Sequence, residues 1–237
     1  MFRLELIRAL GPLGFTLTET QINQFCRFYE RLIETNKVMN LTAITEPRDV
    51  ALKHMADSLS CYGEQWFPQA ASVLDLGTGA GFPGIPLAIM RPDLNITFFD
   101  SLQKRLNFLQ SVTTEMGLEN SAFLHGRAEE DAHRPEYREA FQVVTSRAVA
   151  RLNVLAEWAL PYVKTGGLFI SLKGAQYEEE FAEAASAFRI LGGTVEAVQP
   201  VTLPGLSDKR AVLYIRKTGV CPKKYPRKPK LAAKNPL

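Results

Sequence analysis

The sequence is poor in the residues that build disulfide frameworks and metal sites. It has three cysteines, Cys26, Cys61 and Cys221, and three histidines, and these residues are scattered along the chain. This scatter indicates neither a zinc site nor a disulfide-stapled scaffold, so we expect no metal. No apolar run approaches the roughly 20 residues that cross a bilayer, and charges interrupt the apolar N-terminus. We therefore expect no membrane segment, no signal peptide and a cytoplasmic location.

Charge is close to balanced overall but is unevenly distributed. The 237 residues include 28 Lys and Arg against 25 Asp and Glu. The last 29 residues contain no acidic residue and ten basic ones: Lys209, Arg210, Arg216, Lys217, Lys223, Lys224, Arg227, Lys228, Lys230 and Lys234. The preceding 208 residues carry a net charge of −7. A basic end of this kind favours a polyanionic partner such as nucleic acid, with a solubilising end as the alternative.

The chain divides into three segments. Residues 1–60 predict a helical extension, in which Thr18-Glu19-Thr20-Gln21 fits a capping box and Pro47 opens a second helix. Residues 61–217 alternate strands with helices, which predicts an α/β domain with a largely parallel sheet. Residues 218–237 contain four prolines and are expected to be a flexible, irregular tail.

We predict seven strands and several helices for this domain. The strands are expected at 73–76, 95–100, 122–125, 141–145, 168–172, 194–201 and 211–216, and one helix is expected at 152–163. The link 202–210 is too short for a helical crossover, so the last two strands should pair antiparallel.

The most informative motif is the glycine-rich turn that follows the first strand. Gly77, Gly79 and Gly81 leave the backbone of this turn without side chains. Glycines are used in this way where a ligand approaches the main chain closely. Such a turn at the carboxyl end of a parallel strand binds nucleotide-like ligands. Phe82 stands where a dinucleotide fingerprint has its last glycine, which disfavours a pyrophosphate.

Three further features favour S-adenosylmethionine as the ligand. Asp100 ends the second strand, where a carboxylate accepts hydrogen bonds from ribose hydroxyls. This supports a nucleoside ligand and fits NAD as well as S-adenosylmethionine, and capping of the next helix is the alternative role. The reversed final strand pair is typical of methyltransferases. The turn Leu160-Pro161-Tyr162-Val163-Lys164-Thr165-Gly166-Gly167 is similar to one that precedes their fifth strand.

A closer resemblance rests on longer motifs. They are Asn40–Ile44, His54–Leu59, Leu74–Leu87, Arg127–Glu129, Thr145–Ala148 and Leu172–Gly174. Through them the chain resembles the bacterial small-subunit ribosomal RNA methyltransferase G family, also called glucose-inhibited division protein B. The resemblance implies a Rossmann-like class I S-adenosylmethionine-dependent methyltransferase. It also implies methylation of N7 of one guanine in the 530 loop of 16S ribosomal RNA (conventionally guanine 527).

The resemblance also implies which residues contact the cofactor. These are Gly77, Phe82, Asp100, Ser101, Leu102, Ala128, Glu129 and Arg147. For Glu129 a solvated acid and for Arg147 a surface arginine are the alternatives. The roles of Asn40, His54, Asp57, Ser58 and Lys173 stay open, and His54 with Asp57 fits a structural polar pair on one helix face.

Two absences predict the mechanism. The fourth strand lacks the Asn-Pro-Pro-Tyr motif of amino-group methyltransferases, and no cysteine nucleophile follows it. Guanine N7 has an in-plane lone pair and no proton, so direct in-line attack needs no general base, and catalysis is positioning. The expected partner is 16S ribosomal RNA or the small ribosomal subunit, with the base presented in a loop. The alternatives are another methyltransferase, an NAD-binding oxidoreductase and a catalytically silent RNA-binding module.

Overall fold

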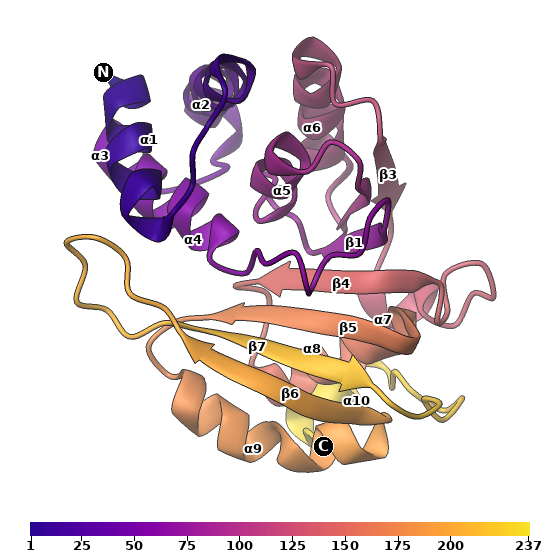
Figure 1. Cartoon of the computed structure of the whole chain (residues 1–237). Coiled ribbons are helices and arrows are strands. Elements are labelled where there is room, and N and C mark those ends of the chain that lie inside the picture. The colour runs from indigo at the N-terminus through magenta and orange to yellow at the C-terminus, as the bar shows by residue number, and fades with distance from the viewer.

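A seven-stranded sheet forms the centre of the computed structural model, which describes residues 1–237 (Figure 1). The strands are β1 (Ser72–Leu76), β2 (Asn95–Asp100), β3 (Ser121–His125), β4 (Phe141–Arg147), β5 (Val163–Lys173), β6 (Gly193–Pro200) and β7 (Ala211–Lys217). Their order is β3-β2-β1-β4-β5-β7-β6. Strands β1 to β5 pair in parallel, whereas β7 is antiparallel to both β5 and β6. The predicted reversal of the last strand is confirmed.

The strand order places the glycine turn at the point where the chain changes direction across the sheet. Strand β1 lies between β2 and β4, so the chain proceeds outward from β1 on both sides. The central strands are apolar on both faces, as strands covered by helices must be. A parallel sheet binds its ligands outside the carboxyl ends of the strands at such a point.

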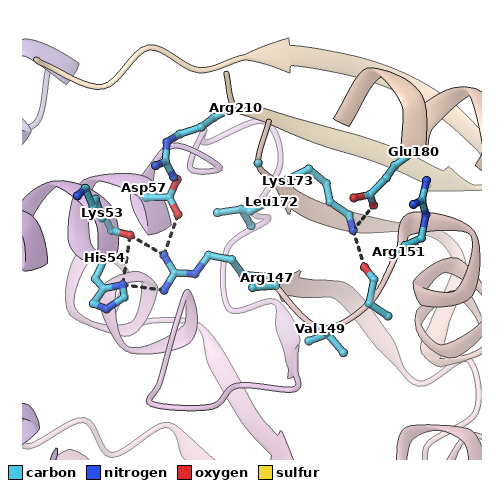
Figure 2. Close-up of a pocket in the computed structure, with 13 residues that line it drawn as sticks. Lys53, His54, Asp57, Arg147, Val149, Arg151, Leu172, Lys173, Glu180 and Arg210 are labelled. Atoms are coloured by element: carbon cyan, nitrogen blue, oxygen red, sulfur yellow. Dashed lines mark hydrogen bonds and ion pairs between the residues drawn. The ribbon is translucent and has the colours of Figure 1, made fainter. Parts of the chain in front are cut away.

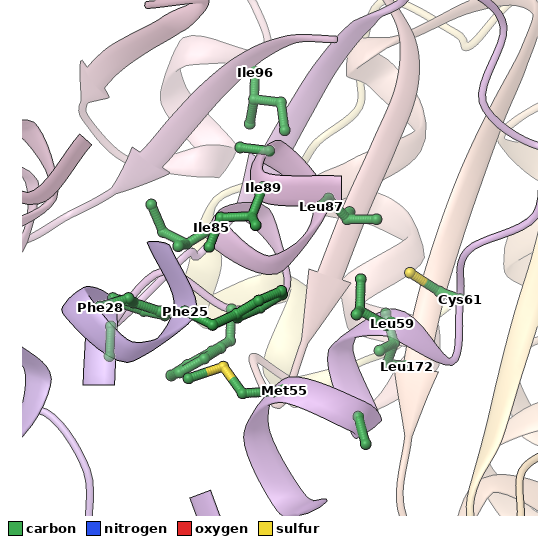
Figure 3. Close-up of a cluster of buried hydrophobic side chains, with 14 of the residues drawn as sticks. Phe25, Phe28, Met55, Leu59, Cys61, Ile85, Leu87, Ile89, Ile96 and Leu172 are labelled. Atoms are coloured by element: carbon green, nitrogen blue, oxygen red, sulfur yellow. The ribbon is translucent and has the colours of Figure 1, made fainter. Parts of the chain in front are cut away.

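Helices cover both faces of the sheet. One face carries α2 (Glu19–Met39), α5 (Gly84–Met90) and α6 (Gln103–Met116), with α1 (Phe2–Leu10) outside them. The other face carries α8 (Leu152–Ala159), α9 (Tyr177–Ile190) and α10 (Pro229–Lys234), with the short α7 (Ala128–Asp131) at its edge. Figure 3 shows Phe25 and Phe28 of α2 packed near Met55 and Ile85, which joins the N-terminal helices to the core under the sheet.

The N-terminal extension is held by local signals and by packing. Helix α2 begins with the predicted capping box, in which the Gln21 backbone N donates to Thr18 Oγ1 at 3.3 Å and the Thr18 backbone N donates to Gln21 Oε1 at 2.9 Å. Pro47 opens α3 (Pro47–Val50), which continues through a π-helical segment, Ala51–Ala56, into α4 (Asp57–Leu59). Wider π turns inside α-helices occur often at functional sites, and this one carries His54.

The boundary between α8 and β5 differs from the prediction. The predicted helix 152–163 ends at Ala159, a 3-10 turn spans Leu160–Tyr162, and β5 already begins at Val163. Pro161 lacks the N–H that would continue the α-helix. The predicted turn at Gly166 lies inside the strand, where Gly166 has φ 82° and the pairing with β4 shifts register. A glycine with positive φ is how a strand accommodates such a bulge.

The C-terminal segment also has more structure than an irregular tail. Pro229–Lys234 form α10, and Ala232 is fully buried against the α8 side of the sheet. Cys221 and Tyr225 are buried in the same core. Among all the helices, none combines the length and the apolar character that crossing a membrane requires.

Candidate active site

The glycine turn adopts a backbone that only glycine takes without strain. Gly77, Gly79 and Gly81 have φ values of 71°, 59° and 102°. The backbone N–H groups of Gly77 and Thr78 both donate to Phe99 O at 2.9 Å, which fixes the turn to β2. A Cβ on Gly77 would lie 2.5 Å from Cγ2 of Val149, in the loop after β4. The turn after β1 and the loop after β4 therefore touch each other at Gly77.

A buried carboxylate holds this turn from below. Asp75 is fully buried and accepts hydrogen bonds from Thr78 Oγ1 at 2.6 Å, the Gly84 backbone N at 3.0 Å and Thr145 Oγ1 at 3.1 Å. Burial raises the pKa of Asp75 to about 6, although its three hydrogen-bond donors oppose the rise. Asp75 ties the turn and the start of α5 to β4, a supporting role that the sequence did not reveal.

Asp100 faces the same turn from the end of β2. Its Oδ2 accepts from the Gly79 backbone N at 2.9 Å, and its Oδ1 accepts from the Leu102 backbone N at 2.9 Å. The Arg105 guanidinium lies 3.3 Å from Oδ2. These contacts fix the carboxylate at the rim of a cavity. The alternative of a helix cap is not borne out, because α6 begins at Gln103 with no side-chain hydrogen bond at its N-cap.

We call this cavity the glycine-turn cavity. It has a volume of about 370 Å³. The lining includes five of the eight predicted cofactor residues: Gly77, Asp100, Ser101, Ala128 and Glu129. Glu129 is only 9% exposed, so the alternative of a solvated acid does not hold. Trp158 and Pro229 also line the cavity, and sequence reasoning missed both.

Phe82, Leu102 and Arg147 are the predicted cofactor residues that do not line the glycine-turn cavity. Leu102 is 42% exposed. Phe82 is buried, and its ring stacks on His54 with the centroids 4.5 Å apart. The Arg147 guanidinium lies 4.9 Å from the Phe82 ring centroid. Cofactor contact by these three residues stays a prediction.

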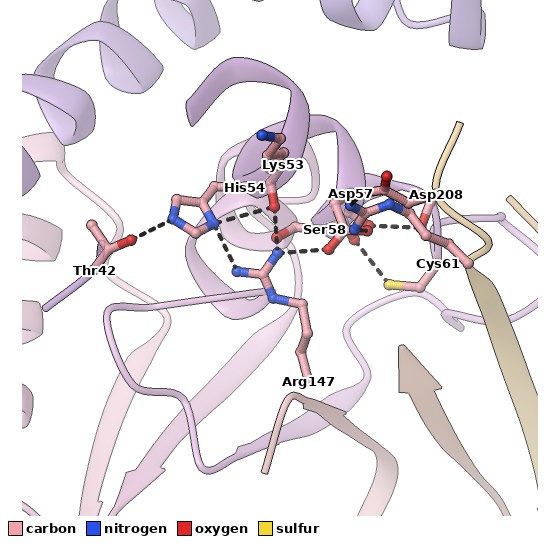
Figure 4. Close-up of polar contacts among 10 residues, drawn as sticks. Thr42, Lys53, His54, Asp57, Ser58, Cys61, Arg147 and Asp208 are labelled. Atoms are coloured by element: carbon pink, nitrogen blue, oxygen red, sulfur yellow. Dashed lines mark hydrogen bonds and ion pairs between the residues drawn. The ribbon is translucent and has the colours of Figure 1, made fainter. Parts of the chain in front are cut away.

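Arg147 is the centre of a polar cluster that joins the sheet to the N-terminal helices (Figure 4). Its Nη1 donates to Asp57 Oδ2 at 2.7 Å and to Lys53 O at 3.1 Å. Arg210 donates to the other Asp57 oxygen at 3.1 Å. The side chains of Arg147, Asp57 and Arg210 are between 11% and 17% exposed, so this is a nearly buried network. The alternative of a surface arginine is therefore wrong for Arg147.

His54 completes the cluster as a neutral ring. Arg147 Nη2 lies 3.3 Å from His54 Nδ1, and Thr42 Oγ1 lies 2.8 Å from His54 Nε2. The tautomer with its proton on Nε2 satisfies both contacts, since Nδ1 then accepts from Arg147, and the 3.2 Å approach of Nδ1 to Lys53 O is then not a hydrogen bond. Burial and the charge of Arg147 lower the pKa of His54 to about 4. The predicted pairing of His54 with Asp57 is replaced by contacts of both residues with Arg147.

A second cavity, the Arg147 cavity, opens on the other side of the loop after β4 (Figure 2). Its volume is about 480 Å³. It is lined by five basic side chains, Lys53, Arg147, Arg151, Lys173 and Arg210, against two acidic ones, Asp57 and Glu180. Ala148 and Val149 line both cavities, so only this short segment separates them.

The segment between the cavities is anchored by Lys173 at the end of β5. Lys173 Nζ donates to Ala150 O at 2.6 Å and pairs with Glu180 at 2.6 Å, while Glu180 accepts from the Leu152 backbone N at 2.8 Å. The Lys173 side chain is 6% exposed. These contacts make Lys173 a structural support of the loop, which answers the role that the sequence left open.

Asn40 lies outside the site, and Arg210 lies in it unexpectedly. Asn40 caps the end of α2 with φ 50°, a left-handed conformation that asparagine tolerates. Arg210 was noticed only as one of the basic residues near the C-terminus. The strand topology could have predicted its position. Strand β7 is antiparallel to β5 and Ala211 pairs with Lys173, so β7 starts where β5 ends and Arg210 lies beside that end.

Comparisons with known proteins match this chain to one family. A family model described as GidB, rRNA small subunit methyltransferase G, matches residues 21–209. A ribosomal RNA small subunit methyltransferase G from Desulforamulus reducens is 48% identical over 230 residues, covering 97% of this chain and 96% of the relative. One from Macrococcus caseolyticus is 49% identical over 237 residues, covering 100% and 99%.

A solved structure supports the fold assignment. A predicted O-methyltransferase from Agrobacterium tumefaciens superposes with a TM-score of 0.53 and 19% identity, covering 69% of this chain and 80% of the other. At this identity the match shows the fold alone. The strand order and this match confirm the class I S-adenosylmethionine-dependent methyltransferase fold.

Proposed function

The chain belongs to the rRNA small subunit methyltransferase G family, and we propose that it methylates N7 of one guanine in the 530 loop of 16S ribosomal RNA. Its methyl donor is S-adenosylmethionine. The observation that carries the proposal is the pair of cavities separated by Ala148 and Val149. Two ligands that occupied them would lie on either side of this short segment, and direct transfer then requires that the segment let the reacting atoms approach to about 3–3.5 Å.

The glycine-turn cavity suits the methyl donor. Gly77 lines this cavity and has a positive φ, so the bare backbone of the turn is open to close approach by a ligand. Asp100 presents a fixed carboxylate for ribose hydroxyls, and the Ala128–Glu129 step supplies backbone and side-chain groups for the adenine edge. We propose that the domain 61–217 carries this cavity, with Pro229 of the C-terminal segment at its edge, and that the helical extension 1–60 closes the other one.

The Arg147 cavity suits a nucleotide of an RNA loop. Five basic side chains against two acidic ones line it, and this lining favours a phosphate-bearing substrate, although each basic side chain also pairs with a carboxylate. The N-terminal helices supply Lys53, His54 and Asp57 to one side of it, and β4, β5 and the residue before β7 supply the other side. The target base has to leave its stack to reach this depth, as bases in RNA loops do.

The chemistry needs no proton acceptor from the protein. S-adenosylmethionine supplies a methyl group bound to a positively charged sulfur. Guanine N7 attacks this methyl with its lone pair, the N7–carbon bond forms as the carbon–sulfur bond breaks, and no proton moves. The groups able to accept a proton in the cavity are already engaged. Asp57 is held by two arginines, His54 by Arg147 and Thr42, and Glu180 by Lys173 and the Leu152 backbone N. Arg147 and its partners position the base.

Methyl incorporation tests the proposal. Unmodified 16S RNA and assembled small subunits are each incubated with the protein and labelled S-adenosylmethionine, and the product is mapped by cleavage at 7-methylguanine. We expect one cleavage site, in the 530 loop. Label in another RNA or at another atom would contradict the proposal, and comparison of the two substrates identifies the partner as free RNA or as the subunit.

A further inference from the structure

We propose that residues 219–237 are a positioning element for the nucleoside end of the methyl donor, anchored by Arg227 and contacting the glycine-turn cavity through Pro229. This inference rests on the assignment of that cavity to the cofactor. It gives the C-terminal segment a role distinct from RNA binding.

The first observation is a buried ion pair between the body and this segment. Glu157 on α8 is 0% exposed. It accepts three hydrogen bonds, all from Arg227: from the backbone N at 2.7 Å, from Nε at 2.8 Å and from Nη2 at 2.6 Å. A fully buried carboxylate is tolerable only when it is paired and hydrogen-bonded in this way. Helix α8 therefore depends on the C-terminal segment to neutralise Glu157.

The second observation is that residues 221–226 hydrogen-bond to residues 133–138, which follow Ala128 and Glu129 in the chain. Arg138 donates to Tyr225 O at 2.9 Å and to Cys221 O at 2.9 Å. His133 Nε2 donates to Pro226 O at 2.8 Å. The stretch that carries Arg138 and His133 begins with α7, which supplies Ala128 and Glu129 to the cavity. Displacement of the segment would release this side of the cavity.

The third observation is direct contact with the cavity. Pro229 opens α10 and lines the glycine-turn cavity together with Trp158, the residue after Glu157. The anchor and the cavity lining are thus adjacent on both elements: Glu157 beside Trp158 on α8, and Arg227 two positions before Pro229 in the segment.

The basic residues near the C-terminus divide into two groups by their contacts. Five are paired with acids of the body: Lys209, Arg210, Arg216, Lys217 and Arg227. Five exposed lysines form no ion pair: Lys223, Lys224, Lys228, Lys230 and Lys234. The lysines of this second group can contact RNA phosphates without giving up an acidic partner, so the two roles of the segment can be separated by substitution.

Calorimetry with S-adenosylhomocysteine and with adenosine tests the inference. Pro229→Glu places a longer, charged side chain at the exposed rim of the cavity without touching the anchor. We expect the Kd of both ligands to rise by about tenfold or more, because the ligand has to displace this side chain and its hydration shell. Pro236→Glu is the matched control, since it makes the same change at an exposed position of the segment away from the cavity. Arg227→Met should raise both Kd values, and Arg227→Lys should restore part of the affinity.

The outcomes separate this inference from the assignment of the cavity. Equal Kd values for Pro229→Glu, Pro236→Glu and the wild type would overturn the inference even if Arg227→Met fails to fold. A Gly77→Val variant tests the cavity itself, and unchanged S-adenosylhomocysteine binding in it would contradict the proposed function instead. Fluorescence of Trp158 in a Trp66→Phe background gives a second readout, because Trp158 and Trp66 are the two tryptophans and only Trp158 lines this cavity.

Discussion

His54 makes the stability of this protein depend on pH in a way that can be calculated. Its pKa is about 4 in the folded protein, against 6.5 for an ordinary histidine. A basic group with a lowered folded pKa contributes stability that is fully present above pH 6.5 and is lost as the pH falls toward 4. At 1.36 kcal/mol for each pKa unit, the full loss is about 3 kcal/mol, of which about 2.5 kcal/mol is lost by pH 4.5.

Asp75 produces the opposite dependence, so the wild type alone cannot test this prediction. The pKa of Asp75 is about 6 in the folded protein and 3.8 otherwise. A carboxyl with a raised folded pKa contributes stability below pH 3.8 and loses it as the pH rises through 6. The two contributions are each about 3 kcal/mol and cancel in large part over the same window.

The test is therefore a comparison with His54→Asn. The Asn side-chain oxygen takes the place of Nδ1 as an acceptor for Arg147, but it does not titrate. The free energy of unfolding of both proteins is measured by urea denaturation between pH 7.5 and 4.5 at constant ionic strength. We expect the wild type to lose about 2.5 kcal/mol relative to the variant as the pH falls. A difference that stays constant within about 0.5 kcal/mol would refute the neutral, buried assignment of His54.

Three other predictions concern the turn, the loop and the tail. Gly77→Ala should weaken S-adenosylhomocysteine binding and destabilise the fold by about 1–3 kcal/mol, because φ is 71° and the added Cβ meets Val149. Calorimetry and thermal denaturation check this. An unchanged Kd together with an unchanged unfolding temperature would contradict it. Lys173→Met should lower kcat more than cofactor affinity, since Ala150 O loses its donor and the wall between the cavities loosens; equal effects on both would count against a positioning role. Replacement of Lys223 and Lys224 by Ala should leave cofactor affinity unchanged and weaken the salt dependence of RNA binding. The slope of log K against log salt should fall by about 0.7 for each phosphate that the protein no longer neutralises. An unchanged slope would show that these lysines do not touch RNA.

The fold was largely predictable because its signals are local. Apolar strands separated by amphipathic helices predict a parallel sheet, and the short link before Ala211 requires the last strand to reverse. The errors lie where two local signals compete. Residues 152–163 have a helical pattern, but Pro161 ends the helix early and tertiary pairing with β4 extends β5 back to Val163.

The sequence predicted a site residue only where that residue lies at or just after the end of a strand of the parallel sheet. Gly77, Asp100 and Ala128 each lie at or just beyond the end of a strand of the parallel sheet, so position along the chain implies position in the cavity. Pro229 and Arg210 come from segments whose placement depends on long-range pairing, with Glu157 and Asp57 respectively. No spacing in the sequence encodes the contact of Arg227 with Glu157, whereas the predicted reversal of the last strand places Arg210 near the end of β5. The alternatives of an NAD-binding oxidoreductase and a different methyltransferase are set aside by the family match.

The network around Asp57 has a consequence for modularity. The Asp57 carboxylate of the N-terminal helices accepts hydrogen bonds from Arg147 at the end of β4 and from Arg210, the residue before β7. The helical extension is therefore not an interchangeable accessory. A chimera that transplants residues 1–60 onto another sheet of this class would import an orphaned acid unless both arginines travelled with it. A substitution at Asp57 in the extension therefore requires compensating changes at Arg147 and Arg210 in the sheet, and the reverse holds as well.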